Sequence, residues 1–347
     1  MHTELKSVVD CPSEWATLEA STPDYAVSTR WLETMGPLLP GEPRWFVASV
    51  DGQPQVGLYT RWLDDPPTEP RYDIAAILRG DIPAFGERLA AAPAAAAESL
   101  YPAVLALQPG YTCAAAGPGA TDPAMLHNTL QTLSGWAEQQ GAKSVSFLYV
   151  PERQRLLHKV LADFGAQPVS LYPTCVMSVD FGDVEEFLAQ LPRQRRGDLR
   201  RLLRRIDESG MTLGEDDLGA VRDQVLELRS STLHKYDSVA ERDVQAATLD
   251  RMIRHYSPED RVVTTIRRAE QVVGFVLALR HGDTLRALWC GQQPDAYGAY
   301  FVMAYYGLVA AALKRGVTHI DYGTLKWPLK MSFGCVLEEL AGYTWTP

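Results

Sequence analysis

Hydrophobic and polar positions along this chain alternate between a strand-like and a helix-like period. Near the N-terminus, two short apolar runs flank an Asp-Gly pair at 51–52, which is typical of a β-hairpin turn. Later, apolar positions recur at helical spacing after an Asp-Pro pair that suits the start of a helix. The first half is therefore predicted to contain, in order, strands Trp45–Val50 and Gln55–Trp62, a helix from Asp122 to Gly141, and a strand Ser144–Val150.

The second half repeats this order. Its predicted elements are strands Arg261–Arg267, Val272–Arg280 and Thr284–Cys290, a very apolar helix from about Ala299 to Arg315, and a strand Val317–Tyr322. The repetition favours an α/β fold with two tandem domains of one architecture, each a mixed sheet flanked by helices. We expect the domains to span residues 1–180 and 181–347. Coincidence is the alternative, because strand–helix–strand order is common.

An arginine-rich segment, Phe187–Gly210, lies between the two halves. Its apolar residues form a helical stripe at 199, 202, 203 and 206, so we expect an amphipathic helix that opens the second domain. An adjoining face carries an arginine row: Arg193, Arg196, Arg200 and Arg204. Guanidinium groups bind phosphate or carboxylate in a bidentate manner, so this row is a candidate tRNA or anion site. The alternative is a solvated face that pairs with acidic residues.

Composition narrows the class of partner. The chain has 347 residues, with 46% hydrophobic and 22% charged residues and a formal net charge of −10. Such an acidic chain is not expected to bind DNA or other nucleic acids broadly, although it can carry a local basic patch. The cysteines and histidines are dispersed, so no metal site is predicted. No apolar signal core or membrane-spanning segment is evident, the alanine-rich stretch Leu89–Leu100 included, so we expect a reducing cytoplasm and no membrane partner.

Two further clusters carry candidate chemistry. The loop that follows the last predicted strand holds charged and aromatic residues, and ligands gather at the carboxyl ends of strands in open α/β sheets. Lys330 could stabilise an oxyanion or a phosphate, and the bland alternative is a lysine on a surface loop. A second cluster, at the end of a predicted helix Leu218–Leu233, could hold a proton donor or acceptor, or could be an ordinary helix end. The candidate residues are Asp321, Tyr322, Lys326, Trp327 and Lys330 in the first cluster and His234, Lys235 and Tyr236 in the second.

Three passages carry a family resemblance. They are Arg196-Gly-Asp-Leu-Arg200, the helix-to-strand passage from Leu313 to Gly323, and Leu329-Lys330-Met-Ser-Phe333-Gly334. In this order and spacing they resemble the acetyltransferase-like (GNAT) superfamily, in its tandem-domain Fem-type branch and relatives. The first resembles that branch's Arg-x-Asn-Ile-Arg pattern, and the last resembles its terminal Lys-x-x-Phe-Gly motif. With the two-half organisation, the resemblance covers most of the chain.

The resemblance implies transfer of an amino acid from aminoacyl-tRNA, a co-substrate, to an amine, without a resident cofactor. It places Lys330 near the aminoacyl ester and Arg196 and Arg200 among the basic residues between the domains. We expect Asp321 or His234 to accept the amine proton. The chain lacks the inserted helical hairpin of the wall-building members, and Asp198 stands where asparagine is usual. These departures favour a small-molecule amine acceptor, in natural-product biosynthesis.

Two other function classes stay open. An acyl-CoA-dependent N-acyltransferase would need the superfamily's pyrophosphate loop before the central helix. That place holds Gln292-Gln-Pro-Asp-Ala-Tyr-Gly298, whose proline and aspartate weaken a nest of amides. A non-catalytic binding protein with degenerate domains is the third class. The sequence leaves the oligomeric state unknown, and we favour a monomer because the apolar helix Ala299–Leu313 suits a core better than an interface.

Overall fold

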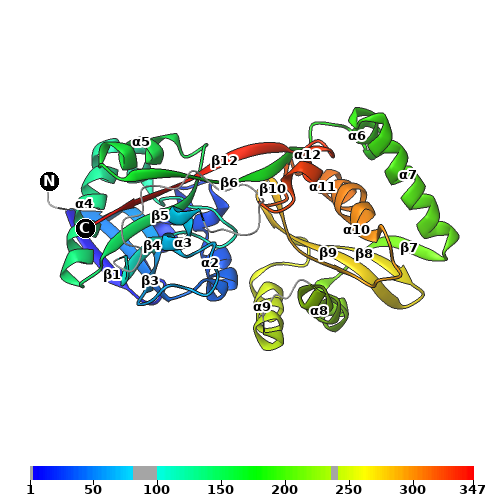
Figure 1. The fold of residues 1–347 in the computed structure, drawn as a ribbon, viewed down its shortest axis with the longest axis horizontal. Coiled ribbons are helices and arrows are strands. Elements are labelled where there is room, and N and C mark those ends of the chain that lie inside the picture. The colour runs from blue at the N-terminus through cyan, green and yellow to red at the C-terminus, as the bar shows by residue number, and fades with distance from the viewer. Residues whose placement is uncertain (1–2, 81–99, 236–240) are drawn as a thin grey trace. The chain divides into compact units, whose positions relative to one another are not determined.

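A computed structural model describes residues 3–80, 100–235 and 241–347, with the backbone alone at Thr3 and Lys235. The chain forms two compact units (Figure 1). Unit 1 comprises Met1–Pro173 together with Glu338–Pro347, and unit 2 comprises Thr174–Leu337. The structure thus differs from the predicted ranges 1–180 and 181–347 at the C-terminus. The last ten residues belong to unit 1 because they continue a strand that pairs within its sheet.

Unit 1 is a mixed sheet flanked by helices. Its strands are β1 (Thr3–Val8), β2 (Glu42–Val50), β3 (Gln53–Leu63), β4 (Ala103–Ala106), β5 (Ser144–Pro151) and most of β12 (Val336–Trp345), and they lie in the order β1-β2-β3-β4-β5-β12. Its helices are α1 (Trp15–Ala20), α2 (Thr29–Met35), α3 (Ile74–Arg79), α4 (Pro123–Gln139) and α5 (Arg155–Asp163). Strands β4 and β5 are parallel, and the pairs β1–β2, β2–β3, β3–β4 and β5–β12 are antiparallel.

The hairpin and the long helix predicted for unit 1 are both confirmed. Asp51 and Gly52 join β2 to β3 with φ values of 49° and 75°, the left-handed region that a tight hairpin turn requires. Helix α4 begins at Pro123, and the Asp122 side chain caps it by accepting bonds from the amides of Ala124 and Met125. Local turn and cap chemistry therefore determined where these elements begin.

Unit 2 repeats the mixed architecture. Its strands are the end of β6 (Gln167–Ser178), β7 (Met211–Asp216), β8 (Arg261–Arg268), β9 (Gln271–His281), β10 (Thr284–Gln292) and β11 (His319–Asp321), in the order β6-β11-β10-β9-β8-β7. Its helical elements are α6 (Val184–Gln190), α7 (Arg193–Glu208), α8 (Leu218–Lys235), α9 (Arg242–His255), α10 (Ala299–Val302), the π-helical turn η5 (Met303–Gly307), α11 (Leu308–Lys314) and α12 (Trp327–Met331).

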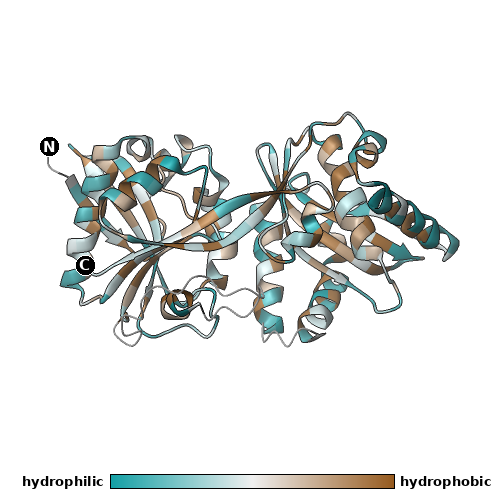
Figure 2. Ribbon diagram, turned by 45° about the horizontal axis from the view of Figure 1, so that its top comes forward, coloured by the Kyte–Doolittle hydropathy of each residue, from teal (hydrophilic) through white to brown (hydrophobic). Residues whose placement is uncertain are grey.

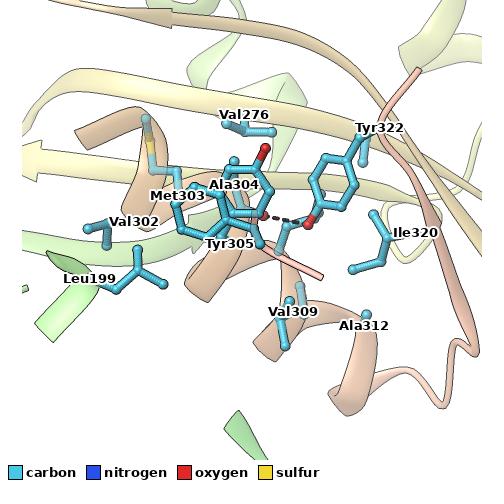
Figure 3. Packing of buried hydrophobic residues seen from close by; sticks show 14 of the residues in the cluster. Leu199, Val276, Val302, Met303, Ala304, Tyr305, Val309, Ala312, Ile320 and Tyr322 are labelled. Atoms are coloured by element: carbon cyan, nitrogen blue, oxygen red, sulfur yellow. Dashed lines mark hydrogen bonds between the residues drawn. The ribbon is translucent and has the colours of Figure 1, made fainter. Parts of the chain in front are cut away.

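Helices cover both faces of the unit 2 sheet. Helices α8 and α9 lie on one side of strands β8–β10, and α10 and α11 lie on the other (Figure 1). The predicted apolar helix 299–315 is present but is interrupted by η5. Its buried side chains pack against β8–β11 to form the core of the unit, part of which is drawn in Figure 3. This arrangement agrees with the expectation that the helix serves a core.

Strands β10 and β11 separate where the candidate loop begins. They are parallel and pair over Thr284–Arg286 and His319–Asp321, the described extent of their ladder. Strand β11 ends there, sooner than the predicted Val317–Tyr322, and the pairing of β10 with β9 is irregular between Ala287 and Trp289. The described ladder thus stops at the carboxyl end of β11, where the loop 322–335 follows, and ligands gather at the carboxyl ends of strands in open α/β sheets.

The arginine-rich segment forms two helices in place of one. Pro192 separates α6 from α7, because proline lacks the amide hydrogen that would continue the first helix. None of the helices in the described ranges is long and apolar enough to cross a bilayer. Within the alanine-rich stretch 89–100, Leu100 is described and the rest lies outside the described residues.

Candidate active site in the second unit

Lys330 is a buried lysine on α12, beside the end of β11. Its side chain is 6% exposed, and Nζ donates hydrogen bonds to the carbonyl oxygens of Tyr322 (2.6 Å) and Gly323 (2.9 Å). Burial lowers the pKa of this amine below its ordinary value, because a charged ammonium loses its hydration, although the neighbouring Cys175 and Asp321 oppose the shift. An ammonium has three donors, so one N–H remains after these two bonds. Lys330 can therefore present one donor to a developing oxyanion.

Asp321 is the buried anchor of the same loop. One carboxylate oxygen accepts hydrogen bonds from the Thr174 hydroxyl (2.9 Å) and the Gly323 amide (2.7 Å), and the other forms an ion pair with Arg286. Asp321 and Arg286 are 7% and 4% exposed, so the pair is largely withdrawn from water. A buried, fully engaged carboxylate is suited to holding a loop in place. The geometry favours such a positioning role for Asp321 over proton acceptance.

Thiols surround the lysine. Cys175 and Cys335 are buried, and desolvation raises the pKa of their thiols to about 11 and about 12. Both thiols are close enough to Lys330 to interact electrostatically with its amine. At neutral pH such thiols are protonated and behave as small apolar groups. They make the surroundings of Nζ dry, which strengthens any hydrogen bond that the lysine donates there.

The loop is tied to the core by stacked aromatic rings. Phe333 stacks on Tyr305 of the π-helical turn, with centroids 4.0 Å apart and planes at 8°. Tyr322 is 7% exposed and donates its hydroxyl to the carbonyl oxygen of Ala304 at 2.7 Å (Figure 3). A π-helical turn releases backbone carbonyls from the regular ladder, and the Tyr322 hydroxyl satisfies one of them. These contacts fix the loop that carries Lys330.

The remaining loop candidates differ in exposure. Trp327 is partly buried and packs against the unit 2 core, whereas Lys326 is exposed. Lys326 has φ of 58° at the start of α12, an uncommon left-handed conformation for a lysine. Tyr322 is buried with its hydroxyl bonded within the protein, so the geometry favours a structural role for it over substrate contact.

The predicted cluster at the end of α8 is described in part. His234 is exposed, and its side chain makes no hydrogen bond to any residue in the described ranges. The backbone of Lys235 ends α8, and Tyr236 lies outside the described residues. The structure therefore brings Lys330, Asp321 and Tyr322 together, and it gives no contact between them and His234.

The arginine row on α7 is partly engaged. Arg200 forms an ion pair with Glu185 of α6 at 2.7 Å, and Arg196 donates to the carbonyl oxygen of Ala189 at 3.0 Å. The side chains of Arg193 and Arg204 are exposed and make no hydrogen bond or ion pair with the described residues. Figure 2 shows α7 as a mostly hydrophilic helix. Two arginines of the row therefore bind to residues of α6, and the other two are available to bind an anion.

Helix α7 packs where the central helix begins. A Cβ at Gly298, the residue before α10, would lie 2.4 Å from the Leu202 side chain, so glycine permits this close approach. Arg205 lies over the ring of Tyr297, 5.6 Å from its centroid. The Gln292 side chain accepts the amide hydrogen of Tyr300 at 2.8 Å. Gly298 is thus covered by α7 and Gln292 is bonded internally, while Pro294, Asp295 and Tyr297 remain exposed, Tyr297 beside Arg205.

Sequence reasoning missed two residues of this site, Arg286 and Thr174. Arg286 was detectable, because a charged residue within the apolar strand Thr284–Cys290 implies a buried partner. Thr174 gave no such signal, since it meets Asp321 across 147 residues of chain. Within the described residues, no group of three or more histidine, cysteine, aspartate or glutamate side chains is placed to hold a metal ion.

Comparison with known proteins agrees with this architecture. Residues 193–331 match the family model described as an acetyltransferase (GNAT) domain. Among solved structures, FemX is 12% identical with a TM-score of 0.65, covering 100% of this chain and 98% of that chain. L-PGS from Bacillus licheniformis is 11% identical with a TM-score of 0.60, covering 96% and 91%. The C-terminal domain of a candidate lysylphosphatidylglycerol synthetase from Agrobacterium fabrum is 12% identical with a TM-score of 0.51, covering 70% and 77%. No curated protein matches the chain in sequence.

At these identities the solved structures establish a shared fold, and the family match adds the acetyltransferase domain. The predicted α/β fold with GNAT-like architecture is confirmed. An acyltransferase-type activity follows from the domain that contains α7, the central helix and Lys330. The predicted resemblance is thereby confirmed: residues 193–331 match a GNAT domain, and the chain shares the fold of FemX.

Proposed function

We propose that this protein is an aminoacyl-tRNA-dependent transferase that joins an amino acid, carried as a tRNA ester, to a small amine. The observation that carries the proposal is the environment of Lys330. Its amine is buried and lies at the carboxyl end of β11, with two carbonyl bonds and one remaining donor. The resemblance stated above assigns this lysine to the aminoacyl ester. The similarity in fold to FemX and L-PGS supports the same donor class.

The reaction needs little covalent chemistry from the protein. A neutral amine attacks the ester carbonyl, a tetrahedral oxyanion forms, and its collapse expels the ribose oxygen of the tRNA. The amine loses its proton, and the departing oxygen gains one. The remaining N–H of Lys330 would stabilise the oxyanion in surroundings that buried thiols keep dry. Asp321 would hold the loop, and His234 or water would carry the proton.

The arginines of α7 would hold the acceptor end of the tRNA. Arg193 and Arg204 are exposed on this helix, and α7 packs beside the residues that precede the central helix. Phosphate binding by arginine suits such a helix. A cytoplasmic, natural-product setting with a small amine acceptor belongs to this proposal. It rests on the sequence features described above, foremost Asp198 and the lack of an inserted helical hairpin.

An acyl-CoA-dependent N-acyltransferase is the second candidate, because the family model is an acetyltransferase domain. The contacts before α10 count against it. The Tyr300 amide is already bonded to Gln292, and Asp295 adds negative charge where a diphosphate would lie, although it pairs with Arg268 at 2.9 Å. Leu202 of α7 lies against Gly298. A nest of free amides for a diphosphate is therefore disfavoured at this helix start.

The test offers the enzyme charged tRNAs, each bearing one amino acid, with a panel of small amines, and measures amide formation by mass spectrometry. We expect a product with at least one charged tRNA. Lys330→Met should lower turnover about 10²–10³-fold, the usual cost of losing one oxyanion donor. Lys314→Ala, at an exposed lysine on α11, should keep full turnover. Transfer from acetyl-CoA with none from any charged tRNA, or full turnover in Lys330→Met, would overturn the proposal.

A further inference from the structure

Arg229, on α8, is a partly buried arginine without a counter-charge among the described residues. Its Nε is shielded from solvent and has no hydrogen-bond partner, and the side chain forms no described ion pair. Two buried arginines of unit 2 do have partners: Arg261 pairs with Asp217 and Arg286 with Asp321. Burial lowers the pKa of Arg229, and the weak opposing influence is the Cys290 thiol. Proteins seldom bury an arginine without pairing it, so the missing anion calls for an explanation.

The surroundings hold this guanidinium in a fixed orientation. It lies over the indole of Trp289 on β10, 5.3 Å from the ring centroid, and Trp289 is 6% exposed. Stacking covers one flat face of the guanidinium and leaves its edge donors available. The next residue, Ser230, also has a shielded hydroxyl without a hydrogen-bond partner. Two unsatisfied donors are thus adjacent in the chain.

The backbone places Arg229 next to the carboxyl-terminal part of β10. A Cβ at Gly291 would lie 2.6 Å from the carbonyl oxygen of Leu228, so glycine lets α8 approach β10 closely at this point. The approach occurs beyond the last pair of the β10–β11 ladder, at Arg286. Arg229 and Lys330 both act electrostatically on the thiol of Cys290. The guanidinium and the candidate catalytic amine therefore both lie near the carboxyl-terminal part of β10.

We propose that Arg229 binds the carboxylate of the acceptor, so that the acceptor is an amino acid or an amine that carries a carboxylate. This inference rests on the proposed function and specifies its substrate. Helix α8 covers the face of β8–β10 opposite α10 and α11, against which α7 packs (Figure 1). The donor's phosphates would meet α7, and the acceptor would enter from the α8 side. One guanidinium can bind a single carboxylate through two parallel N–H donors.

The experiment measures the thermal unfolding of the full chain with free amino acids as probes, each compared with its carboxamide. We expect at least one amino acid to raise Tm by about 2–4 °C at saturating concentration, and its carboxamide to have no effect. Arg229→Gln should abolish the rise. Arg242→Gln should keep it, since Arg242 is an exposed arginine of the same unit that pairs with Glu227. Without ligand, Arg229→Gln should unfold at the same or a higher temperature, because it removes a charge without a partner.

Several outcomes would overturn the inference. They are an equal rise in Tm with an amino acid and with its carboxamide, a rise that persists in Arg229→Gln, a rise with inorganic phosphate alone, and no rise with any amino acid. A lower Tm of ligand-free Arg229→Gln would assign the residue a structural role instead. Amino-acid binding that depends on Arg229, together with failure of all charged tRNAs as donors, would refute the donor and leave the acceptor site standing.

Discussion

At the scale of single residues, the site depends on how a buried amine is accommodated. Lys330 loses hydration and regains two carbonyl bonds, and these do not fully compensate a charged group, so its pKa falls. Asp321 and Arg286 are also buried charged groups, and they compensate for their lost hydration by forming an ion pair. Both carboxylate oxygens of Asp321 are engaged, whereas Lys330 keeps one N–H beyond its two carbonyl bonds.

Stability should rise with pH more steeply in the native protein than in Lys330→Met. In the unfolded chain Lys330 titrates at its ordinary pKa, whereas the folded pKa is lower, so between the two values the unfolded state binds more protons. Linkage then makes the free energy of unfolding increase with pH, by at most about 1.4 kcal/mol per pH unit. Urea unfolding from pH 7 to 10 should show the native free energy of unfolding rising more steeply with pH than that of Lys330→Met. Lys314→Met should follow the native curve, and parallel curves for native and Lys330→Met would contradict the assignment.

Tyr322 provides a second residue-scale test. Tyr322→Phe removes the hydroxyl that satisfies the Ala304 carbonyl of the π-helical turn, which leaves a buried acceptor without its partner. We expect the free energy of unfolding to fall by about 1–3 kcal/mol, measured by urea denaturation. Tyr306→Phe is the matched control, since this partly buried tyrosine of the same turn makes no hydrogen bond to the described residues. An equal loss in both variants would argue against the role assigned to the bond.

At the scale of elements, α7 shows what helical periodicity reveals and what it hides. The spacing of apolar residues predicted the helix and the arginine face, and both are present. Periodicity could not show that Pro192 would separate α6, nor that Arg200 would pair with Glu185 on that helix. Such pairing depends on how the chain turns between helices, which a pattern within one helix does not encode.

The arginines of the row that have no partner among the described residues should therefore contribute more to tRNA binding than those that contact α6. Arg193→Gln and Arg204→Gln should each weaken binding and reduce the slope of log K against log salt by about one, because each removes one phosphate contact. Arg201→Gln is the control, since Arg201 pairs with Asp198 within α7 and is not in the row. Filter binding of bulk tRNA between 50 and 200 mM salt measures the slopes. Equal slopes in the native protein and both row variants would remove α7 from the interface.

At the scale of the whole molecule, the repeat could be predicted because it rests on local signals. Hairpin turns, helix caps and buried strands recur in each half, and each half folds as a mixed sheet. The candidate loop could also be predicted from the sequence, because Lys330 and Phe333 lie in a recognisable order. Contacts between residues far apart in the chain could not be predicted from the sequence. Thr174 meets Asp321, and the final strand pairs within unit 1, only because the fold brings distant segments together.

The pairing of β12 with β5 makes the end of the chain part of the first unit's core. Tyr343 is opposite Phe147 in this ladder, is 7% exposed, and bonds its hydroxyl to His158 at 2.8 Å. Tyr343→Ala removes a large buried ring, so we expect unit 1 to lose about 3–5 kcal/mol of stability, as for other buried aromatic side chains. Hydrogen exchange should then accelerate in β5 and α5 while β8–β10 of unit 2 keep their protection.

Val336→Ala is the matched control for this effect, because Val336 begins the same strand but is 61% exposed. It should leave hydrogen exchange unchanged in both units. Equal acceleration in β5 and in β8–β10 after Tyr343→Ala would mean that the two units unfold as one cooperative body. The expected confinement to unit 1 would instead show that the last ten residues of the chain stabilise the first unit, whereas the site around Lys330 draws its stability from unit 2.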